Sequence, residues 1–514
     1  MNDIFAGYDP EALKRVLMFD QMHPLLFNTG LFLLLFAGFL LIYAAIRKWK
    51  NAKLIFVILF SLYFYYKSSA EYCFILLGVC VFDYVLGRWM GRVAPRSRAG
   101  GRWLILLNVV VNVGMLVYFK YFQLLYETFC SINGTEFDAL NIILPAGISF
   151  FTFRSISYIV DIYRGEMEPA DNFLEYTFFL TFFPPLLAGP VVRAKDMLPQ
   201  IKANPIATRA MVSEGLFLIM AGLVKKVIIS DYISGNFVDR IFENPHLYSG
   251  FENLMGVFGF AIQIYCDFSG YSDMAIGLAL LLGYRFKDNF NSPFKSQNPT
   301  EFWRRWHISL SMWLRDYIYI PMGGNRKGKF RTHVNQMTTM LVGGLWHGAS
   351  WMYLMWGAFQ GVLLIGHKTA RTIYRAPEHL RDSRWIRTGN ILLTFFLTLV
   401  GFTLFRFAML PGTLSDAWEG FTRMTHQIFF EFHPEILIEL FKPESTVFQA
   451  YSLIVLTIIA GYALHFAPHR WAVKTQNAMN ATHPFLQTII LALFLFFVIQ
   501  VRQADLVPFV YLQY

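Results

Sequence analysis

The chain has 514 residues, of which 55% are hydrophobic and only 15% are charged. Soluble domains carry about 25% charged residues, so this composition excludes a soluble globular protein and predicts an all-α integral membrane protein. The net charge of +10 does not indicate nucleic-acid binding, because the Lys and Arg residues gather in short loops between apolar segments. The four cysteines have no metal-ligand spacing, so we expect neither a metal site nor a disulfide framework.

In the first third of the chain, apolar runs predict membrane spans at residues 25–46, 103–121 and 141–158. Two shorter apolar runs, at 54–66 and 72–86, predict a hairpin of short helices. Basic clusters flank this hairpin on both sides. Both clusters belong on the cytoplasmic side of the membrane, which places the N-terminus outside.

The middle of the chain is less regular. In residues 181–201, Pro184, Pro185, Gly189 and Pro190 interrupt an apolar run, which predicts a broken, re-entrant segment. Residues 211–229 predict a helix with two lysines near its end. Residues 251–282 predict either one broken helix or two short ones, interrupted at 267–270 by the polar sequence DFSG.

Residues 298–319 are too charged for a simple span, and their apolar residues recur at helical spacing. The apolar stripe consists of Trp303, Trp306, Leu310, Trp313 and Leu314. The pattern predicts an amphipathic helix in or near the interface. Segments 335–345 and 350–365 predict a hairpin that turns at residues 346–348 within the membrane, and further spans are expected at 390–406, 447–464 and 484–501. The tail, 503–514, would then lie outside. We find no repeat and no linker, so residues 1–514 form a single predicted domain.

Polar and ionisable side chains interrupt the apolar sequence mainly between residues 263 and 360. They are Asp267, Ser269, Asp273, Arg304, Arg305, His307, Arg315, Asp316 and His347. Such groups are costly inside a bilayer and commonly mark function. A neutral His347, set among glycines, can act as a general base, or it can be a buried histidine bonded to a backbone carbonyl. His307 can contact an anionic carrier, or it can be an interface residue on a basic helix.

The remaining polar groups also allow two interpretations each. Asp267, Ser269 and Asp273 can coordinate an ion or line a conduit, or they can bond to the freed backbone of a broken helix. The arginines can hold the phosphates of a nucleotide carrier or anionic lipid head groups. No P-loop, GxGxxG, HExxH or GxSxG motif is present, which weakens most soluble-enzyme explanations.

Five motifs in this region resemble the membrane-bound O-acyltransferase family. They are LLAGPVVR at 186–193, YCDFSGYSDMAIG at 265–277, FNSPF at 290–294, FWRRWHISLSMWLRDYIYIPMGG at 302–324 and LWHGASW at 345–351. The resemblance is dense over residues 144–360. It is strongest to the bacterial branch that includes alginate and peptidoglycan O-acetyltransferases and the teichoic acid D-alanyl transferase. It implies catalytic roles for His347 and His307. It also implies a ring of about eleven membrane-spanning helices, with broken and amphipathic helices, around a central tunnel.

The tail PFVYLQY, residues 508–514, resembles an ending found in the same branch. The resemblance implies that Tyr511 relays an acyl group to an extracytoplasmic transferase. A phenol suits this role because its ester is more reactive than an alkyl ester. The alternative is an aromatic anchor at the membrane interface.

The resemblance implies an O-acyltransferase of the bacterial inner membrane, with both termini extracytoplasmic. We expect it to pass an acyl group, most simply acetyl, from a cytoplasmic thioester such as acetyl-CoA, with no bound cofactor, to a separate SGNH-hydrolase-like transferase and then to a cell-surface polysaccharide. The residues expected to bind the donor or line the tunnel are Trp303, Arg304, Arg305, Trp306, Arg315, Asp316, Trp346, Asp267, Ser269 and Asp273. The alternatives are direct acylation of a lipid or glycan without a partner, a proton or solute transporter, and a scaffold for an export complex.

Overall fold

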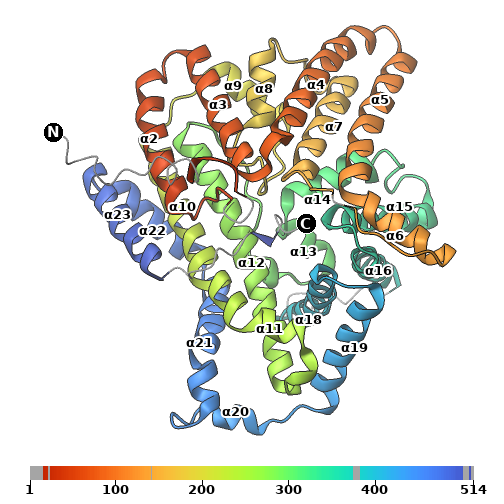
Figure 1. Cartoon of the computed structure of the whole chain (residues 1–514), viewed down its shortest axis with the longest axis vertical. Helices are drawn as coiled ribbons and strands as arrows, with labels where there is room; N and C mark the ends of the chain where they lie inside the picture. The colour runs from red at the N-terminus through yellow and green to blue at the C-terminus, as the bar shows by residue number, and fades with distance from the viewer. Residues whose placement is uncertain (1–15, 21–23, 141, 374–382, 502–508, 511–514) are drawn as a thin grey trace. The chain divides into compact units, whose positions relative to one another are not determined.

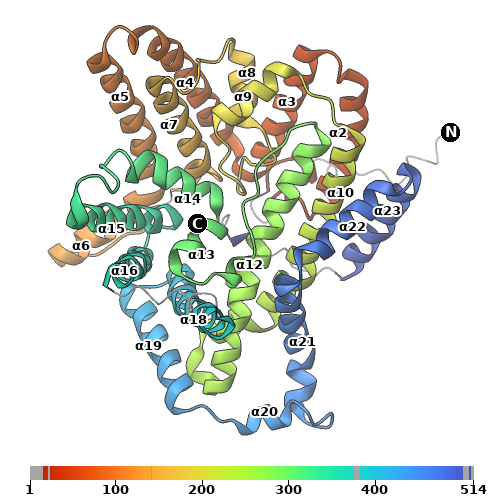
Figure 2. The same cartoon turned by 180° about the vertical axis from the view of Figure 1, so that it is seen from behind.

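The computed structural model describes residues 16–20, 24–140, 142–373, 383–501 and 509–510, and every regular element in these ranges is helical (Figures 1 and 2). The contacts divide the chain into two compact units. Unit 1 comprises Met1–Phe119, Asn141–Ala188 and Val192–Ile206. Unit 2 comprises Lys120–Leu140, Gly189–Val191 and Ala207–Tyr514.

The α-helices of unit 1 are α2 (Gly30–Ile46), α3 (Lys50–Ser69), α4 (Cys73–Val93), α5 (Arg98–Leu116), α7 (Ile148–Arg164), α8 (Phe173–Thr181) and α9 (Ala194–Ala203). The two predicted helices are present as α3 and α4, but the prediction that they are short is wrong, because they have 20 and 21 residues and α3 extends past both lysines that bounded the prediction. Lys53 donates to Pro205 O at 3.1 Å, and Lys67 donates to Val16 O at 3.0 Å. The lysines are therefore accommodated inside the unit and do not end the helix.

The segment with the prolines is broken, as predicted, because no helix covers residues 182–193. The fully buried Arg154 of α7 donates to Leu180 O at 3.2 Å and also to Pro185 O. A buried guanidinium thus satisfies carbonyl groups that the break leaves outside a helix, which is the condition for irregular backbone at membrane depth.

Unit 2 contains the remaining helices. They are α6 (Phe122–Asn133), α10 (Arg209–Leu223), η3 (Val224–Asp231), η4 (Ser234–Val238), α11 (Asp239–Glu243), α12 (Gly250–Leu281), α13 (Pro299–Arg305), α14 (Ile308–Leu314), η7 (Arg315–Tyr319), α15 (Gly328–His347), α16 (Trp351–Ile373), α18 (Arg384–Met409), α19 (Leu414–Phe430), α20 (Glu435–Glu439), α21 (Thr446–Phe466), α22 (His469–Ala481) and α23 (Pro484–Val501). The predicted spans at 390–406, 447–464 and 484–501 correspond to α18, α21 and α23. Helices α19, α20 and α22 were not predicted.

The predicted interruption of residues 251–282 is wrong, because α12 runs through without a break and passes along the middle of unit 2 beside α10 (Figures 1 and 2). Ser249 and Glu252 form a capping box at its start. The polar residues inside α12 are bonded from the neighbouring η3, since Lys226 lies 2.6 Å from Asp267. Side chains that are satisfied in this way leave the helical backbone bonds intact.

The predicted single helix over 298–319 is also wrong. The segment forms two short helices, α13 and α14, separated at Trp306 and His307. His307 has φ of 41°, a left-handed conformation that few residues other than glycine adopt. The break turns the two helices relative to one another while keeping the apolar stripe, Trp303 to Leu314, buried.

Helices α15 and α16 confirm the predicted hairpin, and His347 is the last residue of α15. The hairpin packs closely where Gly344 of α15 meets Gly357 of α16. A Cβ on Gly344 would lie 2.4 Å from Tyr353 O, and one on Gly357 would lie 2.6 Å from Met340 O. Any side chain at either position would push the helices apart, so the glycines set this distance.

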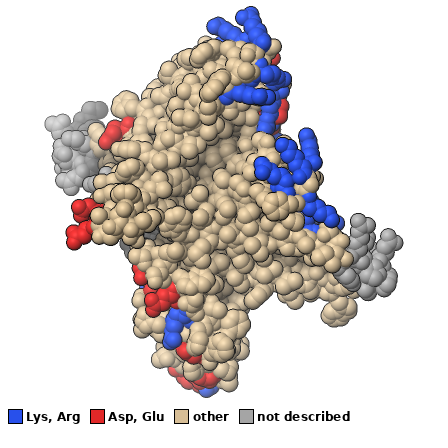
Figure 3. Space-filling model, turned by 90° about the vertical axis from the view of Figure 1, so that its right-hand side faces the viewer, with Lys and Arg blue, Asp and Glu red and all other residues tan. Residues whose placement is uncertain are grey.

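Five helical segments among the described residues are long and apolar enough to cross a membrane: Lys50–Val93, Arg98–Asn133, Arg384–Met409, Thr446–Phe466 and Pro484–Val501. Large apolar side chains on these helices are exposed, for example Trp103 at 70% and Leu493 at 66%. Most of the face drawn in Figure 3 carries neither Lys and Arg nor Asp and Glu. Apolar surface of this extent is stable in lipid and not in water, so the chain is a multi-pass membrane protein.

Helices α10 and α12 cross at two glycine pairs that are one heptad apart. A Cβ on Gly222 would lie 2.6 Å from Gly270 O, and one on Gly270 would lie 2.8 Å from Gly222 O. Gly215 and Gly277 meet in the same reciprocal way. Small residues at such crossings allow membrane helices to pack by close backbone contact.

We predict that Gly270→Ala lowers the stability of the protein by about 1–3 kcal/mol, the usual effect of overpacking a tight interface. The matched control is Gly114→Ala in α5, where a Cβ would meet nothing within 4 Å. Thermal unfolding of both variants in detergent, followed by tryptophan fluorescence, measures the difference. Equal midpoints for the two variants would contradict the close crossing.

Candidate active site

Asn289 connects three segments of unit 2 around His307. Its Oδ1 accepts a hydrogen bond from Ser309 N at 3.2 Å and one from Ser309 Oγ at 2.8 Å, and it lies 3.2 Å from His307 Nδ1. Its Nδ2 donates to Ser272 Oγ of α12 at 3.1 Å. Ser309 Oγ in turn accepts from Val191 N at 2.9 Å. Asn289, which directly precedes the FNSPF motif, thus bonds to residues of two other motifs, and Ser309 links them to a fourth through Val191.

These bonds determine which nitrogen of His307 carries a proton in the neutral ring. Ser309 N can only donate, so the amide atom that it contacts is the oxygen of Asn289. That oxygen can only accept, so Nδ1 of His307 is the protonated nitrogen. The other nitrogen, Nε2, then carries the lone pair of the neutral imidazole and is the atom able to accept a proton or a hydrogen bond.

His347 lies among aromatic rings. Its ring centroid is 5.0 Å from that of Trp356, 5.0 Å from that of Trp346 and 5.2 Å from that of Phe405, each ring meeting it edge-on. The residue is 3% exposed. Because the surrounding rings are rigid, they hold the imidazole in a narrow range of orientations, as a catalytic base requires.

Trp346 connects the two histidines. Its ring centroid is 5.7 Å from that of His307 and 5.0 Å from that of the adjacent His347. His307 also packs edge-on against Phe268 of α12 at 4.6 Å. The two imidazoles therefore belong to one buried aromatic cluster, although they come from different helices.

Side chains from the segment before α6 hold the end of α15 in place. Lys120 Nζ donates to Trp346 O at 2.6 Å, and Tyr121 Oη donates to Leu345 O at 2.6 Å. The last carbonyls of a helix have no partner inside the helix, and a cation there also interacts favourably with the helix dipole. Lys120 and Tyr121 thus fix the backbone that carries His347.

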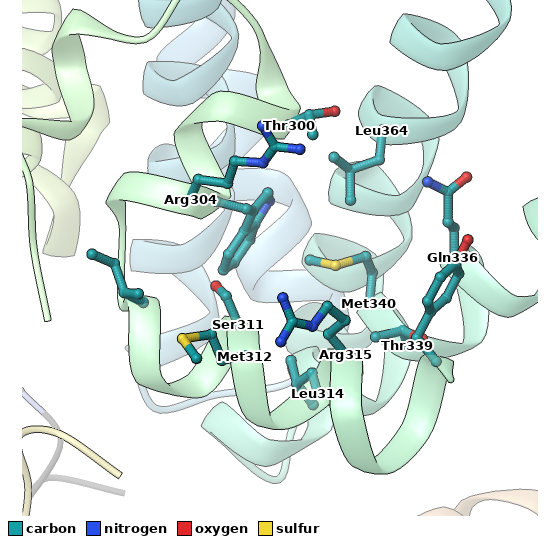
Figure 4. A pocket seen from close by; sticks show the side chains of 13 residues that line it. Thr300, Arg304, Ser311, Met312, Leu314, Arg315, Gln336, Thr339, Met340 and Leu364 are labelled. Carbon is teal, nitrogen blue, oxygen red and sulfur yellow. The ribbon is translucent and has the colours of Figure 1, made fainter. Parts of the chain in front are cut away.

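A cavity of about 690 Å³ opens beside this cluster (Figure 4). Its lining residues are Thr300, Trp303, Arg304, Ile308, Ser311, Met312, Leu314, Arg315, Tyr319, Gln336, Thr339, Met340 and Leu364. The walls are mainly apolar, and Arg304 and Arg315 supply two guanidinium groups. The volume lies within the range of ligand pockets, roughly 300–1,000 Å³.

The cavity is linked to His347 by ring contacts. The centroid of Trp303, in the cavity wall, lies 5.9 Å from that of Trp356, and Trp356 lies 5.0 Å from His347. Trp303 Nε1 is buried and has no hydrogen-bond partner among the described residues. An indole N–H in this position can donate to an acceptor atom of a molecule that enters the cavity.

The structure brings together some of the predicted site residues and separates others. His307, His347, Trp346, Trp303, Arg304 and Arg315 lie in the histidine cluster or the cavity wall. Arg305 is outside the lining and pairs with Glu301 at 2.8 Å. Asp316 pairs with Arg315 at 2.7 Å. Trp306 is buried in the core and stacks against Phe302.

The three polar residues of α12 lie away from the cavity lining. Asp267 pairs with Lys226 at 2.6 Å and Asp273 pairs with Lys225 at 2.5 Å. Ser269 accepts from Lys225 at 3.2 Å. Tyr511 is outside the described residues. No group of three His, Cys, Asp or Glu residues suited to a metal ion occurs in the described part of the chain.

Several residues that shape the site carry no recognisable signal in the sequence. Asn289 precedes the FNSPF motif by one position, and nothing in the local pattern distinguishes it from a loop asparagine. Lys120 and Tyr121 come from a segment more than 200 residues before α15 in the sequence. Trp356 and Phe405 lie in apolar runs that predict only membrane helices. Their roles depend on long-range contacts, which periodicity does not report.

The sequence of the chain is similar to those of several known proteins. The model of the membrane-bound O-acyltransferase family matches residues 170–410. The probable alginate O-acetylase of Pseudomonas aeruginosa is 39% identical over 444 residues, covering 85% of this chain and 81% of the relative. That of Pseudomonas putida is 36% identical over 95% of this chain and 100% of the relative. The peptidoglycan O-acetyltransferase of Helicobacter pylori is 35% identical over 74% of this chain and 78% of the relative.

We predict that Asn289→Ala destabilises the protein by about 1–3 kcal/mol, because buried donors at Ser309 and His307 lose their acceptor. Asn291→Ala is the matched control, since its exposed side chain lies two positions further along the same segment. Thermal unfolding in detergent measures both. If the two variants unfold at the same temperature, Asn289 is not the connecting residue that its contacts indicate.

Proposed function

The chain belongs to the membrane-bound O-acyltransferase family, and we propose that it transfers an acetyl group from a cytoplasmic thioester to an extracytoplasmic polysaccharide. It is an O-acyltransferase by membership of that family. The acetyl group and the polysaccharide acceptor are proposed because relatives similar over most of their length are named as alginate or peptidoglycan O-acetyltransferases.

One observation carries the proposal: the cavity with its two arginines connects through Trp303 and Trp356 to His347. Acetyl-CoA carries phosphates at one end and a thioester at the other. Arginines bind phosphate groups well because several N–H donors face the oxygens at once. With the phosphates at Arg304 and Arg315, the acyl end of the donor points along the tryptophans toward the histidine.

In the proposed reaction, His347 acts as general base. It removes the phenol proton of Tyr511 as the phenol oxygen attacks the thioester carbonyl carbon. The C–O bond forms, the C–S bond breaks, and the thiolate leaves and takes up a proton. His307, held by Asn289 through Nδ1, assists by packing its ring against the bound thioester. The products are an aryl ester on Tyr511 and free CoA.

The ester then passes to a hydroxyl group of a separate SGNH-hydrolase-like partner and from there to the polysaccharide. The loops that flank α3 and α4 are rich in basic residues, which supports a cytoplasmic position for both loops in a bacterial inner membrane. Both termini are then extracytoplasmic. A ring of about eleven spanning helices around a tunnel remains the architecture that we propose for the whole chain.

We predict that the purified protein gains the mass of one acetyl group on incubation with acetyl-CoA and that the group maps to Tyr511. His347→Ala and Tyr511→Phe abolish the adduct, because the base or the acceptor oxygen is gone. His333→Ala, on the same helix as His347, leaves it unchanged. Intact mass spectrometry followed by peptide mapping makes the measurement.

Other outcomes of this experiment distinguish the alternatives. Consumption of acetyl-CoA with an added acceptor but no adduct would indicate direct acyl transfer without the tyrosine relay. Neither adduct nor turnover with any acceptor would contradict the proposed reaction and favour transport or a scaffold role.

We further predict that Arg304→Gln and Arg315→Gln each raise the KM for acetyl-CoA, by roughly three- to tenfold because partly exposed charge pairs are screened by solvent. The kcat should change little, since these residues contact the donor far from its thioester. Arg331→Gln, an exposed arginine of α15 outside the cavity lining, is the control. Steady-state kinetics with the proposed acceptor system separate the two parameters. A fall in kcat at constant KM would contradict a phosphate-binding role.

A further inference from the structure

The last described residues of the chain, Phe509 and Val510, are buried within unit 2. They are 1% and 4% exposed, although α23, the nearest preceding helix, exposes most of its surface. A C-terminal segment that acts only as a surface anchor would leave such residues in contact with lipid or water. Their burial indicates a specific docking position.

Three contacts define this position, and all lie on α12 or η3. Val510 N donates to Asp267 Oδ2 at 2.9 Å. The ring of Phe509 meets that of Tyr271 edge-on, with centroids 4.3 Å apart. Lys226 Nζ lies 4.5 Å from the centroid of Phe509, within the range of a cation–π interaction.

Three charged side chains lie close together beside Phe509 and Val510. Lys226 Nζ lies 2.6 Å from Asp267 Oδ1 and 2.7 Å from Asp231 Oδ1, and all three residues are buried. One oxygen of Asp267 thus faces the lysine and the other accepts the main-chain N–H of Val510. A buried ion pair is stable only when its remaining hydrogen-bonding capacity is also used. The C-terminal segment completes that requirement.

The docked residue also borders a second cavity, of about 240 Å³. Its lining consists of Ser230, Ser234, Asp239, Glu243, Gln263, Asp267, Arg406, Met409, Leu410, Pro411 and Val510. Gln263 Oε1 is buried there without a hydrogen-bond partner among the described residues. Val510 therefore lies beside a polar space that can hold water or hydroxyl groups.

We propose that Lys226, Asp231 and Asp267 form a clamp that docks the C-terminal segment of this chain through the backbone of Val510 and the ring of Phe509. Recognition through a backbone N–H is independent of the side chain at position 510, so the clamp fixes the path of the chain. That this path presents the following tyrosine for acylation rests on the proposed function, whereas the docking does not. The three residues are positioning residues and take no part in the chemistry.

The test introduces a single reporter thiol, Val510→Cys, into the full-length protein and measures its rate of modification by a maleimide, with no acyl donor present. The substitution keeps the backbone N–H. We expect slow modification in the folded protein, because the site is buried. Asp267→Ala and Phe509→Ala, each added to the reporter chain, should raise the rate roughly tenfold or more, since a hydrogen bond to a charged group contributes at least that factor.

The matched control is Asp273→Ala. Asp273 lies on the same helix and pairs with the neighbouring lysine, Lys225, at 2.5 Å, but makes no contact with Phe509 or Val510. It should leave the rate unchanged. Mass spectrometry of the protein without the Val510→Cys substitution measures how fast the maleimide modifies the four native cysteines. If Asp267→Ala unfolds the protein, Phe509→Ala decides, because it shortens one side chain outside the helices and leaves the ion pairs of α12 intact.

Two results would contradict the proposed docking. One is a reporter thiol that reacts as fast in the folded protein as in the SDS-denatured chain. The other is a modification rate that Phe509→Ala leaves unchanged. Failure of the proposed function gives a different result. A protected thiol together with no acetyl adduct on Tyr511 would show that the segment docks without serving as a relay.

Discussion

Charged side chains buried by this fold have partners, either backbone carbonyls or opposite charges, and the contact between η3 and α12 shows the second case most directly. Lys225 and Lys226 face Asp273 and Asp267 across that contact. Without these pairs, the buried carboxylate of Asp267 and the half-buried one of Asp273, in the middle of a long apolar helix, would carry a desolvation penalty. With them, α12 stays continuous over 32 residues and provides one rigid surface for the rest of unit 2.

The same helix supports both the histidine cluster and the C-terminal segment. Asp267 accepts a hydrogen bond from Val510, and the next residue, Phe268, packs against His307. Further along the helix, Ser272 bonds to Asn289. The close glycine crossing with α10 limits how far α12 can shift, because neither backbone has a side chain to compress. The geometry between the two sites is thus set by one helix and not by a flexible connection.

The sequence predicted the class of fold and singled out two histidines as candidates, but it did not indicate how they are held. Hydropathy is a local property, so α18, α21 and α23 could be predicted closely from their own residues. The break at His307 could not, because its left-handed backbone depends on Asn289, 18 positions away. Nor could the continuity of α12, because the polar residues that suggested an interruption are neutralised by lysines of another helix. The position of Arg305 outside the cavity lining could not be predicted either, because it depends on how the helix that carries Arg305 packs.

The consecutive positions of Asp267 and Phe268 place a physical limit on the proposed relay. Val510 N is 2.9 Å from the first side chain, and the His307 ring centroid is 4.6 Å from the ring of the second. Consecutive residues of an α-helix face different sides of the helix, so these two contacts lie on different faces of α12. The proposed relay therefore requires the residue after Val510 to bridge the two faces of a helix whose position is limited by the glycine crossing with α10.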